Sequence, residues 1–404
     1  MTNEKSESKH PLQWPSGLQL GLSMLAAMLL LSLAGLALLG ALGGLIFQSL
    51  DIAEVTASLM TGIALFAASL ILLLSSALAF QRMRSKSISW PWLSKLTSFL
   101  KMRAGWLAVG FLVVGALVGQ SETLSLVALP PIHTLTVLLI ALGLFMRAAR
   151  DIQVGSPQRV FGVFTSGMVL APAISMVLEI IAGILLVVIG LLYISLQPAH
   201  VGLMEQLGSM DIGLLTEAEY LDVINPLVQD PVLVGLILLF IAFLVPLIEE
   251  LLKPIGLYFS MNRDWSPASG FALGALSGAG FGLFENLALT AGRAEWLGLI
   301  GARVGTTAIH MLASGIIGWG LVRAKNEKRY LGLFWAYLTS VVLHGVWNGL
   351  TLMAAMGAIN PDSIFAPPKV IFGIVFGLFI LGLGSIFVLG LNRRRLLAAS
   401  QTSD

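Results

Sequence analysis

The sequence contains no cysteine and few charged residues. The absence of cysteine excludes disulfides, thiolate metal ligands and a cysteine nucleophile. Only 11% of the residues are charged, whereas 57% are hydrophobic, and the mean hydropathy is +0.92. A soluble fold could not bury this much apolar surface, so the composition excludes an ordinary globular domain and predicts a polytopic membrane protein.

Long polar segments and internal repeats are also absent. No polar stretch is long enough to form a soluble domain, which argues against a nucleotide-driven pump, and we expect no nucleic-acid partner. The two halves show no repeat of the kind found in many transporters. Residues 1–17 are polar, but the apolar run after them is too long for a signal peptide, so we expect a retained first helix.

The apolar runs predict an all-α bundle of about ten transmembrane helices, because a span needs about 20 residues. The predicted spans are residues 18–47, 56–80, 105–120, 131–147, 168–196, 231–258, 268–291, 297–321, 331–356 and 368–391.

The charges between these spans are sorted by sign. Segment 81–104 has six Lys or Arg and no acidic residue, and segment 322–330 has four basic residues and one Glu. Segment 198–230 has six acidic residues and no basic one. By the positive-inside rule we expect the basic segments and both termini in the cytoplasm, with the acidic loop outside a cell membrane that the chain crosses many times.

These features divide the chain into five parts. They are an N-terminal tail (1–17), scaffold helices (18–196), an acidic extracytoplasmic loop (197–230), a core that carries the chemistry (231–356), and a last helix with a basic tail (357–404).

Ionisable residues concentrate in the core. Placing an ionisable side chain at bilayer depth costs several kcal/mol of free energy unless it is paired or lines a polar cavity. Such residues therefore mark a functional site. The candidate residues are Glu249 and Glu250 in VPLIEELLKPIGLYF, Glu285 in GFGLFENL, His310 in TTAIHMLASG, and His344 with Asn348 in LHGVWNG.

Each candidate also has a purely structural interpretation. Glu249 could form an interfacial salt bridge with Lys253, Glu285 could be a protonated packing residue, and His310 could be a neutral core imidazole. A shared polar pocket accounts for all of them together. Glu249 and Glu250 lie about 100° apart around a helix, so they cannot both point into one cavity in the same way. One of them can activate water while the other supports it. Counting rise along the predicted spans places Glu250 and Glu285 at different depths.

Small residues mark one helix as central. Glycines at 270, 274, 278 and 282 recur every fourth residue and therefore share one helix face. Such a face lets a neighbouring backbone approach closely. We expect the span 268–291 to be the tightly packed centre of the bundle.

Four motifs in this order resemble those of the PrsW family of intramembrane proteases, which is related to the CAAX-processing and bacteriocin-processing membrane proteases. The resemblance covers about residues 231–356, where EExxK matches Glu249–Lys253, GFGxxEN matches Gly280–Asn286, the Arg-to-His helix matches Arg303–His310, and HxxxN matches His344–Asn348.

The resemblance implies an endopeptidase whose site contains Glu249, Glu250, Glu285, His310 and His344. It further implies cleavage in or near the transmembrane segment of a membrane-anchored protein, an anti-sigma factor being the type of substrate known for the family.

The motifs leave the mechanism open. Glu250, Glu285, His310 and His344 could ligate Zn²⁺ with a position left for water. Alternatively, a Glu base with His and Asn348 as oxyanion donors needs no metal. The sequence has no HExxH zinc helix, and it also lacks the G-x-S-G and GxGD signatures of other proteases.

A non-hydrolytic transporter or binding protein is the alternative. Its buried Glu and His residues would relay protons or hold a ligand. It would more readily explain Glu179, a carboxylate in SMVLEIIAG that lies outside the four motifs. A proton relay has no need of Asn348, so the HxxxN motif favours the protease.

Overall fold

The computed structural model describes residues 14–84, 91–197, 229–261, 265–290, 293, 295–360 and 363–401. Every regular element in these ranges is helical, and together they form ten spans that are long and apolar enough to cross a membrane. The predicted all-α bundle of ten helices is thus confirmed. Most of the predicted acidic loop 197–230 lies outside the described residues.

The helices of the first half run in the following order. They are α1 (Trp14–Phe47), α2 (Ile52–Met83), α3 (Pro91–Val118), α4 (Glu122–Ala149), α5 (Pro157–Thr165), the π-helical turn η1 (Ser166–Leu170) and α6 (Ala171–Ser195). Helices α3 and α4 begin well before the predicted spans 105–120 and 131–147. Helix α4 continues through Pro130 and Pro131, since neighbouring groups in a bundle can compensate for lost helical hydrogen bonds.

The second half contains the motifs. Its elements are α9 (Pro231–Leu239), the π-helical turn η4 (Phe240–Leu244), α10 (Val245–Leu252), α11 (Ile255–Ser260), α12 (Pro267–Ala288), α13 (Trp296–Glu327), α14 (Tyr330–Ile359) and α15 (Pro368–Gln401).

Two spans contain a π-helical turn shortly before a proline. Turn η1 precedes Pro172, and turn η4 precedes Pro246. Proline lacks an N–H and its ring clashes with the carbonyl four residues earlier, so a wider turn relieves the conflict. In the second case the wider turn lies directly before the segment that carries Glu249 and Glu250.

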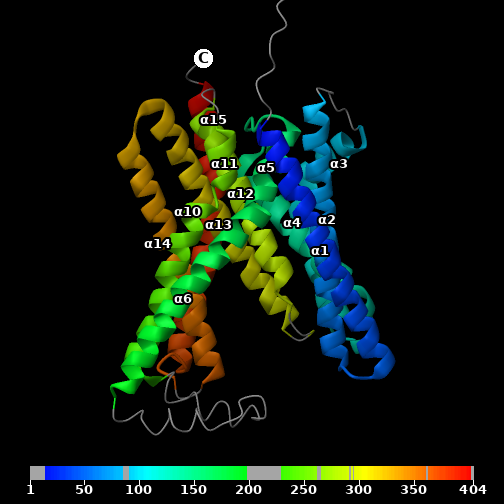
Figure 1. Cartoon of the computed structure of the whole chain (residues 1–404), viewed down its shortest axis with the longest axis vertical. Helices are drawn as coiled ribbons and strands as arrows, with labels where there is room; N and C mark the ends of the chain where they lie inside the picture. Colours follow the sequence, from blue (N-terminus) through cyan, green and yellow to red (C-terminus); the bar gives the residue numbers. More distant parts are fainter. Residues whose placement is uncertain are drawn as a thin grey trace, which may run out of the picture.

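Helix α12 lies in the middle of the bundle (Figure 1) and forms the most buried of the ten spans. A Cβ at Gly274 or Gly278 would overlap the carbonyl oxygen of Ser314 or His310 on α13. On another side of α12, Gly280 packs against the backbone of α5 and η1. The predicted central helix is confirmed, and its glycines allow α13 to approach at backbone distance.

Basic side chains gather at one end of the bundle. Helix α1 begins and α15 ends at the same end, drawn at the top in Figure 1. The same end holds the last turn of α2 with Arg82 and the last turn of α13 with Lys325. This sorting agrees with the orientation expected from the charges, which itself stays a prediction.

Candidate functional site

Lys253 is the centre of the candidate site. Its side chain is fully buried, and Nζ lies 2.6 Å from Glu250 Oε1 and 3.0 Å from Glu249 Oε2. The ring of Phe281 lies 4.4 Å from the same ammonium group. The Glu249–Lys253 salt bridge considered from the sequence is therefore present, with two features that the sequence did not indicate. The pair is buried, and Glu250 shares it because a lysine three or four residues later reaches both carboxylates.

His310 connects this ion pair to Glu285. Its Nδ1 lies 2.8 Å from Lys253 Nζ, and its Nε2 lies 2.8 Å from Glu285 Oε2. An ammonium group can only donate, so Nδ1 accepts and the ring proton belongs on Nε2, where it is donated to Glu285. The chain Glu250–Lys253–His310–Glu285 thus spans the difference in depth expected between the two glutamates.

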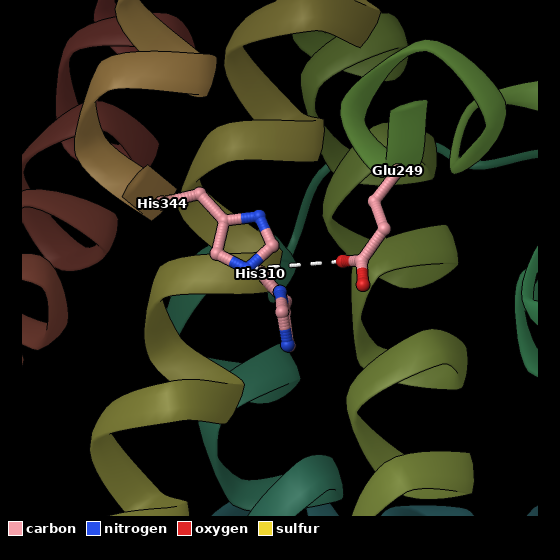
Figure 2. Close-up of side chains that lie close together, drawn as sticks. All are labelled: Glu249, His310 and His344. Atoms are coloured by element: carbon pink, nitrogen blue, oxygen red, sulfur yellow. Dashed lines mark ion pairs between the residues drawn. The ribbon is translucent and has the colours of Figure 1, made fainter. Parts of the chain in front are cut away.

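His344 is held by Glu250. Its Nδ1 lies 3.0 Å from Glu250 Oε1 and 3.4 Å from Lys253 Nζ. The shorter contact, to a carboxylate that accepts hydrogen bonds, assigns the ring proton to Nδ1. The Nε2 lone pair then faces Glu249 Oε2 at 3.7 Å (Figure 2). The two imidazole rings meet edge to face, with their centroids 4.8 Å apart.

Three of these side chains form a group that could hold a metal ion. Glu249, His310 and His344 each offer one ligand atom, and these atoms lie within 4.8 Å of one another. One carboxylate and two imidazoles are a donor set typical of catalytic zinc. Glu285 contacts His310 Nε2, and Glu250 contacts His344 Nδ1. In metal sites, a carboxylate often holds in this way the histidine nitrogen that does not bind the metal.

This group contains Glu249 beside the two histidines, whereas the possible ligands named from the sequence were Glu250, Glu285 and the two histidines. The reason is the angular separation of Glu249 and Glu250 on α10. Glu250 Oε1 already accepts from Lys253 and His344. Glu285 Oε2 accepts from His310 and lies 3.9 Å from Arg303 Nη1.

Asn348 contacts the backbone of η4. Its Nδ2 donates to the carbonyl of Ile241 at 3.3 Å. One turn earlier, Gly345 packs directly against the carbonyl oxygen of Ala242. Both carbonyls belong to η4, so the turn that precedes Pro246 is where α14 docks against the Glu249 helix. This docking aims His344 at Glu249.

A cavity of ≈ 810 Å³ opens beside the cluster, between α13, α14 and α15. Its polar lining residues are Glu285, Arg303, Asn348, Thr306 and Thr351. The rest of its wall is mainly apolar and includes Leu299, Val304, Leu352, Val375, Phe379 and Leu383. Glu285 is 27% exposed at its side chain, whereas Glu250 and Lys253 are fully buried. Glu285 is thus the member of the cluster that faces this cavity.

His133 was not among the candidate residues identified from the sequence. It is fully buried in α4, and its Nδ1 accepts a hydrogen bond from Trp296 Nε1 at 3.2 Å. A histidine inside an apolar span was the signal that could have found it, as it found His310. Glu179 lies on α6, and its Oε1 has no hydrogen-bond partner among the described residues.

Residues 212–383 match the sequence model of a family described as PrsW family intramembrane metalloprotease. The match includes all four motifs and extends beyond the predicted limits of 231–356, into the part of α15 that lines the cavity. No curated protein and no solved structure matches the chain. The resemblance to the PrsW family is confirmed.

Proposed function

From the PrsW match over residues 212–383, we propose that this multi-pass membrane protein is an intramembrane endopeptidase of the cell membrane. Its substrate is a membrane-anchored protein of the anti-sigma-factor type, cut in or near the transmembrane segment. The observation that carries the proposal is the convergence of Glu249, His310 and His344, each histidine being oriented by a further carboxylate.

Glu249 Oε2, His310 Nδ1 and His344 Nε2 would hold a divalent metal ion such as zinc. Such an ion lowers the pKa of a bound water and polarises a carbonyl group. Glu285 and Glu250 keep the ring protons on the outer nitrogens, so that both lone pairs face inward. Lys253 donates to His310 Nδ1, so its ammonium group competes with a metal for that nitrogen.

The residues themselves can activate water. Glu249 Oε2 and His344 Nε2 are both acceptors, and at 3.7 Å apart they are close enough for one water to contact both. A water that donates both protons in this way keeps its lone pairs for attack on a peptide carbonyl. As the water attacks, Glu249 would take one of its protons and pass it to the leaving amine. Lys253 stays paired with both buried carboxylates and offsets their negative charge.

The substrate segment would lie in the cavity beside Glu285. The apolar wall from α13, α14 and α15 suits a transmembrane segment, and the cavity ends at the polar groups of the cluster. Arg303 and Asn348 carry N–H groups at that end, which can bind the carbonyl oxygens of an unwound peptide and the oxyanion formed during hydrolysis.

Glu249→Gln, compared with Glu179→Gln, tests the proposal. Both changes replace a carboxylate in a membrane span with its neutral isostere, but only Glu249 belongs to the cluster. We expect Glu249→Gln to abolish cleavage of a membrane-anchored reporter and to lower the bound metal measured by mass spectrometry. Glu179→Gln should leave both unchanged.

Two results would contradict the proposal. Normal cleavage in folded Glu249→Gln would remove Glu249 from the active centre. Abolished cleavage in folded Glu179→Gln would show that the site extends beyond residues 231–356 and would favour a proton path through α6.

A further inference from the structure

A second cavity, of ≈ 510 Å³, lies away from the cluster, between α1, the α5–η1–α6 span and α11. It belongs to none of the four motifs, and most of its lining comes from the scaffold half of the chain. Its polar lining includes Arg82, Arg159, Gln19, Gln158 and Ser260. These residues lie where α1 and α5 begin and where α2 and α11 end, which is the basic end of the bundle.

The remaining lining is apolar and lies deeper along the helices. Leu22, Leu25 and Leu29 follow Gln19 along α1 and reach one to three turns further from the basic end. Val169 and Leu170 of η1 belong to the same wall. One cavity therefore combines a cationic end with a hydrocarbon-like interior.

Within the part of the chain that the structure describes, nothing acidic offsets the positive charge of this cavity. No acidic residue is among its lining residues, and neither Arg82 nor Arg159 has an ion pair among the described residues. Arg159 lies over the ring of Trp265 at 5.3 Å. Two guanidinium groups that line one cavity without a counter-charge are arranged to bind an anion, and a phosphate group suits their forked donors best.

We propose that this cavity binds a phospholipid with an anionic headgroup. The phosphate contacts Arg82 and Arg159, and an acyl chain covers Leu22, Leu25 and Leu29 of α1. Basic pockets between transmembrane helices at the cytoplasmic side are typical sites for such lipids. A free phosphate would leave the apolar wall uncovered, whereas a lipid satisfies both ends of the cavity.

Binding of defined lipids to the full-length protein in detergent tests this proposal, with native mass spectrometry as the readout. The probes are phosphatidylglycerol, phosphatidylcholine and inorganic phosphate. The variants are Arg82→Gln and its matched control Arg84→Gln, two residues away. Arg84 lies over the ring of Phe80 at 4.6 Å and does not line the cavity.

We expect the wild type to bind phosphatidylglycerol more tightly than phosphatidylcholine. Arg82→Gln should weaken that binding by about tenfold, which is the loss of one charge-assisted hydrogen bond, and Arg84→Gln should leave it unchanged. Arg159→Lys, which keeps the charge next to Trp265, should weaken it less than Arg159→Gln.

Three outcomes would overturn the proposal. Equal binding of the two lipids would remove the role of the headgroup charge. Equal loss in Arg82→Gln and Arg84→Gln would indicate a diffuse surface effect. Inorganic phosphate that displaces the lipid completely at equal concentration would show a simple anion site with no role for the acyl chain.

Discussion

At the residue scale, Lys253 determines the electrostatics of the site. It is the fully buried cation in contact with Glu249 and Glu250, and it also donates to His310. Its position follows from the EExxK spacing, which puts one lysine within a helical turn of both carboxylates. Charges at this depth persist only when they are paired, so the three residues form one unit.

Lys253→Met should destabilise the fold by about 3–5 kcal/mol, because it leaves two buried carboxylates without their cation. The matched control is Lys369→Met, at an exposed position near the start of α15. Chemical denaturation in detergent measures both variants. Equal stability of the two would mean that Lys253 does not offset the buried charge, and the account of the cluster would then be wrong.

At the scale of elements, two close approaches between helices position the site. Helix α13 meets α12 at the glycine repeat, which brings His310 to Glu285. Helix α14 meets η4 at Gly345, which brings His344 to α10. A side chain at either contact would separate groups that need to lie within hydrogen-bonding distance.

Gly278→Ala should therefore reduce both stability and cleavage. A Cβ there would overlap the carbonyl oxygen of His310, and overpacking of this kind costs about 1–3 kcal/mol. Gly384→Ala on α15 is the matched control, since nothing lies within 4 Å of a Cβ at Gly384. Thermal unfolding and reporter cleavage measure both variants. A Gly278→Ala protein as stable and active as the control would show that α12 and α13 can separate without loss.

At the scale of the whole molecule, the ten spans place the start of α1 and the end of α15 at one end of the bundle (Figure 1). The positive-inside rule predicts that this end lies in the cytoplasm. The orientation matters for the proposed lipid site, because it decides which leaflet the cavity between α1, α5 and α11 faces.

Single cysteines can report the orientation, since the natural sequence has none. Gln120→Cys lies between α3 and α4 at one end, and Arg395→Cys lies in the last turns of α15 at the other. A membrane-impermeant maleimide should label Gln120→Cys on intact cells and should label Arg395→Cys only after permeabilisation. The reverse pattern would invert the orientation predicted for the chain.

Local features of the sequence were enough to predict the helical fold. Hydropathy over about 20 residues sets a membrane span, and the repeat of glycines at every fourth residue marked the central helix. Charges inside apolar runs marked the candidate residues, because such charges are costly at any tertiary position. Each of these signals depends only on neighbours along the chain.

Only the tertiary structure decided which groups face one another. The EExxK spacing brings Lys253 to Glu250, but His344 is 91 residues from Lys253, and no local pattern indicates that it joins them. The sequence named Glu250 and Glu285 as possible metal ligands and left the choice open, and the packing of α14 against η4 points His344 Nε2 at Glu249. Ring orientation depends on contacts between helices, and shifts of a few ångströms in helix packing decide those contacts. The sequence thus determined the membrane bundle and the candidate side chains, and the packing of α10, α12, α13 and α14 decided the role available to each.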